Sequence, residues 1–327
     1  SKAQGIERGR KELPHILEFM RKNFPGFSDA RLVDTAEQLY VRETRHLVGE
    51  YRLTVTDVLE NRDHWDRIAH ASYPVDIQPS GPDDLGNVIG KPAIYSIPFR
   101  CLVPLRVESL LVVGRSASYD SLAHGSARVV PVGMAAGEAA GVAAAYSVEH
   151  EIGFREMSRS REAVREVQER LKKQGAYLVE YEPPRPAVMD HWAYPGVRGM
   201  RELGRAAGGY ANDYRLDEPA RHWDADFMLG RVLARARQLK PGPARALAPF
   251  PQELTRGDLL LGLGEALSGE RNTLEKSLEI LREKSVLGPE TEGRVLQDIK
   301  AAPTFGELYM LLSNLYQVLN APGTGQS

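Results

Sequence analysis

Two short groups of glycine and small polar residues in the middle of the sequence have a spacing that suits the binding of an anion. Gly114 ends the apolar run 109–113, and Gly125-Ser-Ala-Arg128 precedes a stretch that is dense in alanine. The start of a helix carries about half a positive charge and free N–H groups, so an anion is stabilised there. Arg128 would add to that charge. An ordinary strand–loop–helix unit has the same pattern, and spacing alone does not separate the two interpretations.

Hydrophobic periodicity predicts the elements that position this cluster. Residues 109–113 are expected to form a buried strand and residues 115–125 a polar loop. Residues 132–148 are expected to form a helix. Its glycines recur every fourth residue on one face and would let another backbone approach closely: Gly133, Gly137 and Gly141.

Other segments have equally simple patterns. Apolar residues at helical spacing predict a helix that ends before Pro25, a short helix after Thr54 and an amphipathic helix over 160–173. A last strand is expected over 177–181. Residues 182–186, with the sequence EPPRP, are predicted to be a stiff linker, and the chain beyond them is expected to be almost wholly helical.

Composition narrows the classes of function. The chain has 327 residues, 42% of them hydrophobic, and a formal charge of −2, so we expect about two domains and no general attraction to nucleic acid. Cys101 is the only cysteine, which excludes a cysteine zinc site, and we predict no metal centre. No stretch approaches the roughly 20 apolar residues that span a bilayer.

The first half of the chain resembles a bacterial family of FAD-dependent oxidoreductases within the glutathione-reductase-like flavoproteins. The blocks that carry the resemblance stand in the family's order: RETR at 42–45, GEY at 49–51, LT at 53–54, YSIPFRCLVP at 95–104, LLVVGRS at 110–116, GSARVVP at 125–131 and GEAAG at 137–141. Together they cover most of residues 1–180. No block is decisive alone, but the ordered set is specific.

The resemblance implies FAD as the cofactor and assigns roles to individual residues. Those implied to line the FAD are Gly114, Arg115, Ser116, Ser118, Gly125, Ser126 and Arg128. Tyr95 and Arg100 are implied to lie on the substrate side, with Arg100 holding an anionic or carbonyl-bearing substrate. The family's Thr-His-Glu run is replaced here by Asp120-Ser-Leu122, which leaves His124 as a displaced candidate for proton transfer.

The dinucleotide fingerprint Gly-x-Gly-x-x-Gly is absent from this sequence. In the family it opens the polypeptide, where its glycines let the backbone approach the diphosphate. We therefore expect an incomplete FAD site and a fragment, or a chain whose partner subunit carries the remainder. A relative that has lost FAD stays an alternative.

The second half resembles S-layer homology repeats. The first repeat is carried by DHWAY at 190–194, LG at 203–204, GY at 209–210, YRLDEP at 214–219 and DF at 226–227; TRGD at 255–258 and TFGE at 304–307 resemble later repeat starts. Such modules imply attachment to anionic polysaccharide of a bacterial cell wall, with Arg256 and Trp192 as binding residues. Ordinary helix caps and pure scaffolding are equally compatible with these segments.

Taken together, the sequence predicts an α/β part, a partial FAD-binding fold with mixed substrate-domain strands, and an all-α helical module. The domains are 1–181, the linker 182–186 and 187–327. The predicted function is hydride transfer from an unidentified organic substrate to flavin. The alternatives are an envelope-binding protein with a non-catalytic flavoprotein-like scaffold, or one subunit of a complex. The predicted location is the bacterial envelope or the exterior if the repeats bind the wall, and the cytoplasm otherwise.

Overall fold

The computed structural model describes residues 2–78, 86–239 and 248–321, and it divides into two units, Ser1–Arg45 and His46–Ser327. The first unit contains helix α1 (Lys2–Asn23), which ends before Pro25 as predicted and has no buried residue. The segment after it returns along the helix. Arg21 Nε donates to Ala30 O at 2.6 Å, and a Cβ on Gly5 would lie 2.8 Å from Leu39 Cδ2. Because no residue of α1 is buried, its apolar side chains do not form a core within this unit.

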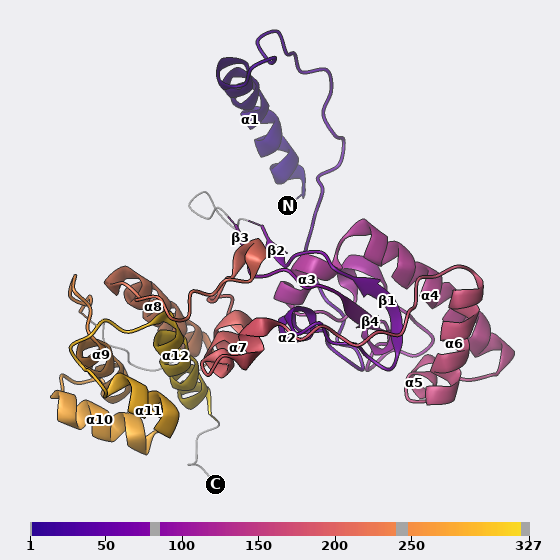
Figure 1. Ribbon diagram of the computed structural model, residues 1–327. Coiled ribbons are helices and arrows are strands. Elements are labelled where there is room, and N and C mark those ends of the chain that lie inside the picture. Colours follow the sequence, from indigo (N-terminus) through magenta and orange to yellow (C-terminus); the bar gives the residue numbers. More distant parts are fainter. Residues whose placement is uncertain (1, 79–85, 240–247, 322–327) are drawn as a thin grey trace. The chain divides into compact units, whose positions relative to one another are not determined.

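In the part of the chain that the structure describes, the second unit contains helices at both ends and four short strands between them (Figure 1). In its first half these are α2 (Val55–Leu59), β1 (Arg67–Ala71), β2 (Asp76–Ile77), β3 (Asn87–Val88), β4 (Tyr95–Pro98), α3 (Ser121–Ala127), α4 (Val130–Glu149), α5 (Phe154–Met157) and α6 (Arg161–Lys173). The helices of its second half are α7 (Tyr194–Glu202), α8 (His222–Leu239), α9 (Arg256–Ser268), α10 (Leu274–Glu283), α11 (Pro289–Val295) and α12 (Phe305–Asn320). Short 3₁₀ turns include η1 (Phe99–Cys101) and η2 (Gly114–Ser116).

The strands of the described residues form two separate antiparallel pairs, β1 with β4 and β2 with β3. In the first pair Ala69 lies opposite Ile97 and Ala71 opposite Tyr95. Helix dominates the fold, so the predicted α/β class holds only loosely. The helices predicted after Thr54, over 132–148 and over 160–173 are confirmed as α2, α4 and α6.

Three local predictions were wrong. Residues 109–113 are not a strand, and Leu110 and Val113 remain 43% and 38% exposed, because no neighbouring strand bonds to this run in the described part of the chain. The expected loop 115–125 instead enters helix α3, whose start is capped by the Asp120 side chain at Ala123 N. Residues 177–181 are not a strand either.

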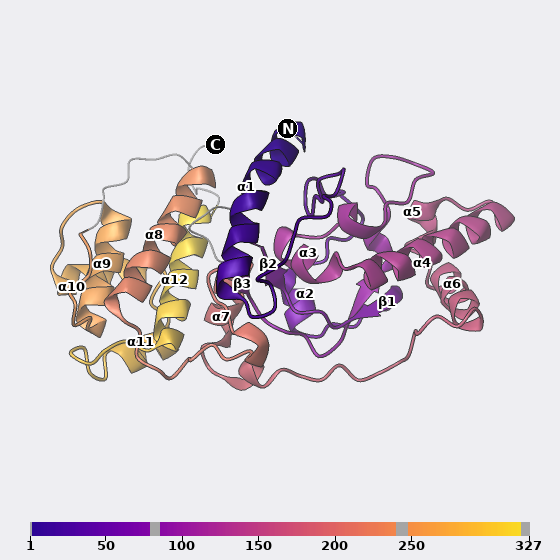
Figure 2. The same ribbon diagram turned by 90° about the horizontal axis from the view of Figure 1, so that it is seen from above.

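Buried apolar side chains of the second unit form two clusters. One joins residues between Leu53 and Leu178, and the other joins residues between Val197 and Leu315. Figure 2 shows α8, α9, α10 and α12 gathered at one end of this unit, with α4, α5 and α6 at the other. In the second cluster α7 packs closely on α12, where a methyl group on Gly196 would lie 2.5 Å from Met310 N.

Candidate functional site

Gly114 lies at an open turn beside the start of α4. Its φ of +67° is in the left-handed region, which favours glycine, and no atom lies within 4 Å of the position that its Cβ would take. A Cβ on Gly133, in the first turns of α4, would lie 3.7 Å from the Gly114 Cα. Arg115 and Ser116 are exposed, whereas Ser118 is buried and accepts a hydrogen bond from Gly49 N at 3.2 Å.

The start of α4 has the electrostatic character that the sequence suggests. Its N-cap, Val129, provides no side-chain hydrogen bond, and its first turn contains no acidic residue. The positive end of the helix dipole is therefore not compensated by a carboxylate on the helix itself. Val130, the first residue of α4, is 69% exposed. Gly114 and the start of α4 form one accessible surface that suits a negatively charged group.

Gly125, Ser126 and Arg128 occupy a different kind of environment. A Cβ on Gly125 would lie 2.8 Å from Ile77 Cδ1, so this glycine allows β2 to approach α3. Ser126 is fully buried and donates to Tyr73 O at 2.5 Å, and Arg128 Nη2 lies 3.7 Å from Asp76 Oδ2. These three residues hold the segment around β2 in place.

Tyr95 and His124 are both buried. The Tyr95 hydroxyl shares a hydrogen bond of 2.7 Å with Ser126 Oγ, and burial raises the pKa of that hydroxyl. His124 is only 2% exposed on α3, and its ring meets the His46 ring edge-on at 4.8 Å between centroids. The structure thus brings predicted substrate-side Tyr95 together with predicted cofactor-side Ser126, but inside the core.

Arg100, a predicted site residue, contacts one carboxylate and two aromatic rings. Its Nε and Nη2 bond to the two carboxylate oxygens of Asp66 at 2.8 and 3.0 Å, and this pairing raises the pKa of the guanidinium. Asp66 is fully buried, while a quarter of the Arg100 side chain is exposed. The guanidinium carbon also lies 4.9 Å from the ring centroid of Tyr51 and 5.4 Å from that of Trp65.

A partly buried polar network continues from Tyr51, and the sequence did not indicate it. The Tyr51 hydroxyl donates to Asp57 Oδ2 at 2.9 Å, and Arg62 Nη1 lies 2.6 Å from Asp57 Oδ1. Burial, followed by the charge of Asp57, raises the pKa of Tyr51. His64 packs edge-on against Tyr51, and burial lowers its pKa although Asp57 and Asp66 act in the opposite direction.

The two predicted wall-binding residues lie in the helical module. Arg256 is held by Glu307 through a two-pronged ion pair at 2.9 and 2.8 Å, and its Nη1 donates to Asp298 O at 3.2 Å. Trp192 is partly exposed, and the Arg294 guanidinium lies 4.2 Å from its ring centroid. A ligand at Arg256 would have to compete with a buried carboxylate.

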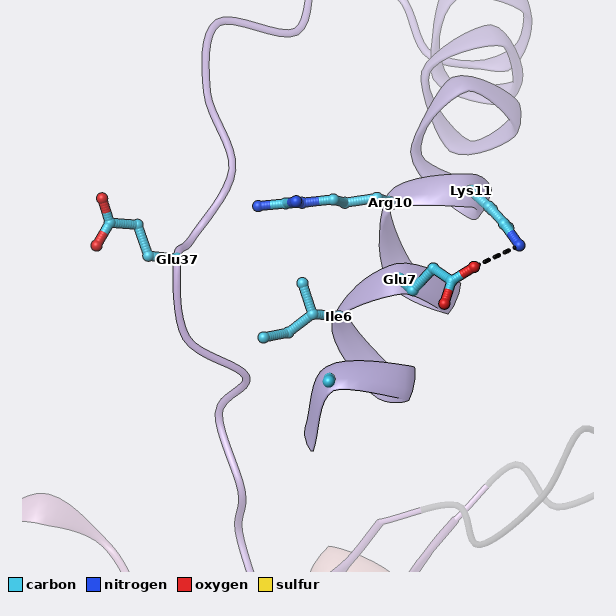
Figure 3. Close-up of a pocket in the computed structure, with 6 residues that line it drawn as sticks. Ile6, Glu7, Arg10, Lys11 and Glu37 are labelled. Carbon is cyan, nitrogen blue, oxygen red and sulfur yellow. Dashed lines mark hydrogen bonds and ion pairs between the residues drawn. The ribbon is translucent and has the colours of Figure 1, made fainter. Parts of the chain in front are cut away.

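A hollow of about 550 Å³ in the first unit contains none of the predicted site residues. Figure 3 shows Ile6 and Arg10 directed from α1 toward the segment that carries Glu37, and Lys11 bonded to Glu7 at 2.8 Å. Oppositely charged side chains line it together, so it has no preference for one sign of charge.

Among the described residues, no single helix is long and apolar enough to cross a membrane. Helices α3 and α4 reach the required length and apolar composition only when they are counted as one span, and the chain bends by 91° between them.

Comparison with known proteins relates the first half of the chain to one protein family. A family model described as FAD dependent oxidoreductase matches residues 3–171. Searches of the curated proteins and of the solved structures found no match to this chain.

Proposed function

This chain belongs to the family of FAD-dependent oxidoreductases, and we propose that it is the C-terminal part of an enzyme that transfers a hydride from an organic substrate to flavin. The observation that carries this proposal is the accessible surface formed by Gly114 and the uncapped start of α4. A bound flavin would supply the hydride chemistry, while the protein supplies position and charge.

The residues present fit a flavin in part. Gly114, Arg115 and Ser116 lie at the surface beside the positive end of α4, where they can hold a negatively charged ring system. Gly125 and Ser126 are buried against β2 and its neighbours, so we propose that they shape the site from behind.

Arg100 is proposed to hold the substrate through its side chain, a quarter of which is exposed. Asp66 fixes the orientation of the guanidinium with two hydrogen bonds, which leaves a rigid, charged donor at the surface. Such a donor suits a carboxylate or a carbonyl oxygen. The buried Tyr95 and His124 would act on this site from within the protein.

We further propose that a second polypeptide segment, the N-terminal portion or another subunit, supplies the diphosphate-binding loop. The support is an uncovered apolar surface on one face of α4, where Val130, Met134 and Val148 are 69%, 70% and 80% exposed. Leu110 and Val113 are further exposed apolar side chains. Exposed apolar surfaces of this kind usually mark an interaction site.

Flavin binding by the purified chain tests this proposal. We expect the isolated chain to show little visible flavin absorbance after mixing with FAD and desalting, and to gain it when the complementary polypeptide is present. Tight stoichiometric FAD binding by the chain alone would contradict the need for a second segment. The mass of the protein isolated from its native source would show whether that segment is covalently joined.

A second proposed function is attachment of the helical module to anionic wall polysaccharide, which would place the protein in a bacterial envelope. The repeat-like starts at Thr255 and Thr304 both form capping boxes, and Trp192 offers a partly exposed ring beside Arg294. If Arg256 binds the polymer, Arg256→Ala abolishes sedimentation of the protein with purified cell walls. Unchanged sedimentation removes Arg256 from the site, and a scaffolding role for the module then remains.

A further inference from the structure

Glu60 lies where the helical module, residues 187–327, meets the part of the family match that belongs to the second unit, residues 46–171, here called the family domain. Side chains of both contact its carboxylate. It follows the last turn of α2, and its side chain is 12% exposed. From the module, the Tyr194 hydroxyl donates to Oε1 at 2.7 Å, and Arg198 Nε lies 3.5 Å from the same oxygen. From the family domain, Arg62 Nη2 donates to Oε2 at 3.2 Å.

The module side of this contact is a buried arginine. Arg201 on α7 is only 1% exposed, and its Nη2 donates to the Tyr194 hydroxyl at 2.9 Å. Its guanidinium also lies between the rings of Tyr194 and Tyr214, 5.4 and 5.7 Å from their centroids. A buried arginine is normally paired with an acid. Here the Tyr194 hydroxyl accepts a hydrogen bond from Arg201 and donates one to Glu60, so it connects the buried guanidinium to the Glu60 carboxylate.

The family-domain side leads from Glu60 to the proposed substrate site in four contacts. Arg62 bonds Glu60 and also pairs with Asp57 at 2.6 Å. Asp57 accepts the Tyr51 hydroxyl at 2.9 Å, and the Arg100 guanidinium lies over the Tyr51 ring. Each of these contacts restrains one side chain against a charged partner. A substitution of Glu60 therefore changes the contacts that orient Tyr51 and Arg100.

We propose that Glu60 is a positioning residue through which the C-terminal helical module sets the orientation of Tyr51 and Arg100. The helical module then contributes to the geometry of the oxidoreductase site, in addition to any ligand that it binds itself. Figure 1 shows α7 directly beside α2, as this role requires. The assignment of Arg100 to substrate binding rests on the proposed function, but the contact chain does not.

The test uses Trp65 as a reporter that needs no flavin. Arg100 and Arg161 lie 5.4 and 4.8 Å from its ring centroid, so the environment of Trp65 follows the position of Arg100. The chain contains three tryptophans, and the full-length protein labelled with 5-fluorotryptophan gives three ¹⁹F resonances. Single replacement of Trp192 and Trp223 by phenylalanine assigns them.

Tyr194→Phe removes the hydroxyl that joins Arg201 to Glu60, and Glu60→Gln removes the charge. We expect both to shift the Trp65 resonance by more than its linewidth. Tyr309→Phe is the matched control, because Tyr309 is a buried tyrosine of the same module on α12, outside this chain of contacts. It should leave the resonance in place.

Thermal unfolding of each variant separates positioning from simple stabilisation. If Tyr194→Phe and Glu60→Gln lower the unfolding temperature while the Trp65 resonance stays unchanged well below it, the two residues are structural and the proposal is overturned. A shift of equal size in Tyr309→Phe overturns it as well. Absence of flavin binding even with the complementary polypeptide present would count against the proposed function alone, because the ¹⁹F measurement is made without flavin.

Discussion

At the scale of single residues, the best-defined feature is the pair of Asp66 and Arg100. The buried carboxylate accepts the Arg100 backbone N–H at 3.0 Å as well as two guanidinium bonds. A carboxylate in this position is stabilised almost entirely by those donors, because water does not reach it. The pair therefore serves the fold as well as any substrate at the surface.

Removal of the Arg100 guanidinium should be costly for that reason. Arg100→Met leaves the Asp66 carboxylate buried without its cation, and we expect the free energy of unfolding to fall by roughly 3 kcal/mol. Urea denaturation measures the change. The double variant Arg100→Met with Asp66→Asn should recover more than half of the loss, because a neutral amide costs less to bury. A loss below about 1 kcal/mol would mean that the pair behaves as an exposed ion pair.

Acid should destabilise the protein through His64. Burial lowers its pKa in the folded state below the ordinary value of 6.5, so the unfolded chain takes up this proton first as pH falls. The contribution of His64 to stability is complete above pH 6.5 and is lost as pH drops through that value, with a slope of up to about 1.4 kcal/mol per pH unit. His64→Gln should reduce the slope measured by urea denaturation between neutral and mildly acidic pH. Identical slopes in the two proteins would contradict this.

The sequence indicated single residues better than it indicated their partners. Arg100 could be selected from its motif, but Asp66 stands 34 positions earlier and belongs to no motif. Arg256 was predicted to bind an external anion, which stays a prediction, but the sequence did not indicate the internal ion pair of Arg256 with Glu307. Pairing between distant residues depends on the tertiary fold, which neither residue type nor spacing encodes locally.

At the scale of elements, helices were predicted well because their signals are local. Thr54, Thr255 and Thr304 each form a capping box with the acidic residue three positions later. Strands were predicted poorly, because a strand exists only with a partner. The run 109–113 has the composition of a buried strand, yet it has no partner strand in the described chain. Val112 N donates to Leu102 O at 2.9 Å outside any strand, and Leu110 and Val113 stay exposed.

Two helix glycines should respond oppositely to alanine. A Cβ on Gly196 would lie 2.5 Å from Met310 N, a backbone atom that cannot move easily, so Gly196→Ala should cost about 1–3 kcal/mol or more. Gly230 on α8 has no atom within 4 Å of that position, so Gly230→Ala should gain up to about 1 kcal/mol from helix propensity. Thermal unfolding compares the two. Equal effects would show that α7 and α12 are not in close contact.

At the scale of the whole molecule, the described residues of the second unit form two apolar cores and leave one face of α4 uncovered. The Leu53–Leu178 cluster buries one side of α4, including Ala136, Ala139 and Ala143. The opposite side exposes Met134 and Val148. A sequence read alone identifies the helix and its glycine spacing, but which side is covered depends on the other chain segments. The family match indicates a flavin site without showing that this chain completes it.

The glycines of that uncovered face provide the sharpest test of a missing partner. No atom lies within 4 Å of the Cβ position of Gly137 or Gly141. In the isolated chain, Gly137→Ala and Gly141→Ala should therefore each raise the free energy of unfolding by up to about 1 kcal/mol, measured by urea denaturation. In the native assembly the same methyl groups would separate α4 from the backbone packed on it. We expect the variants to lose co-purification with the complementary polypeptide and the flavin absorbance that it brings. Variants that are stabilised alone and still assemble normally would show that this face of α4 is not the interface.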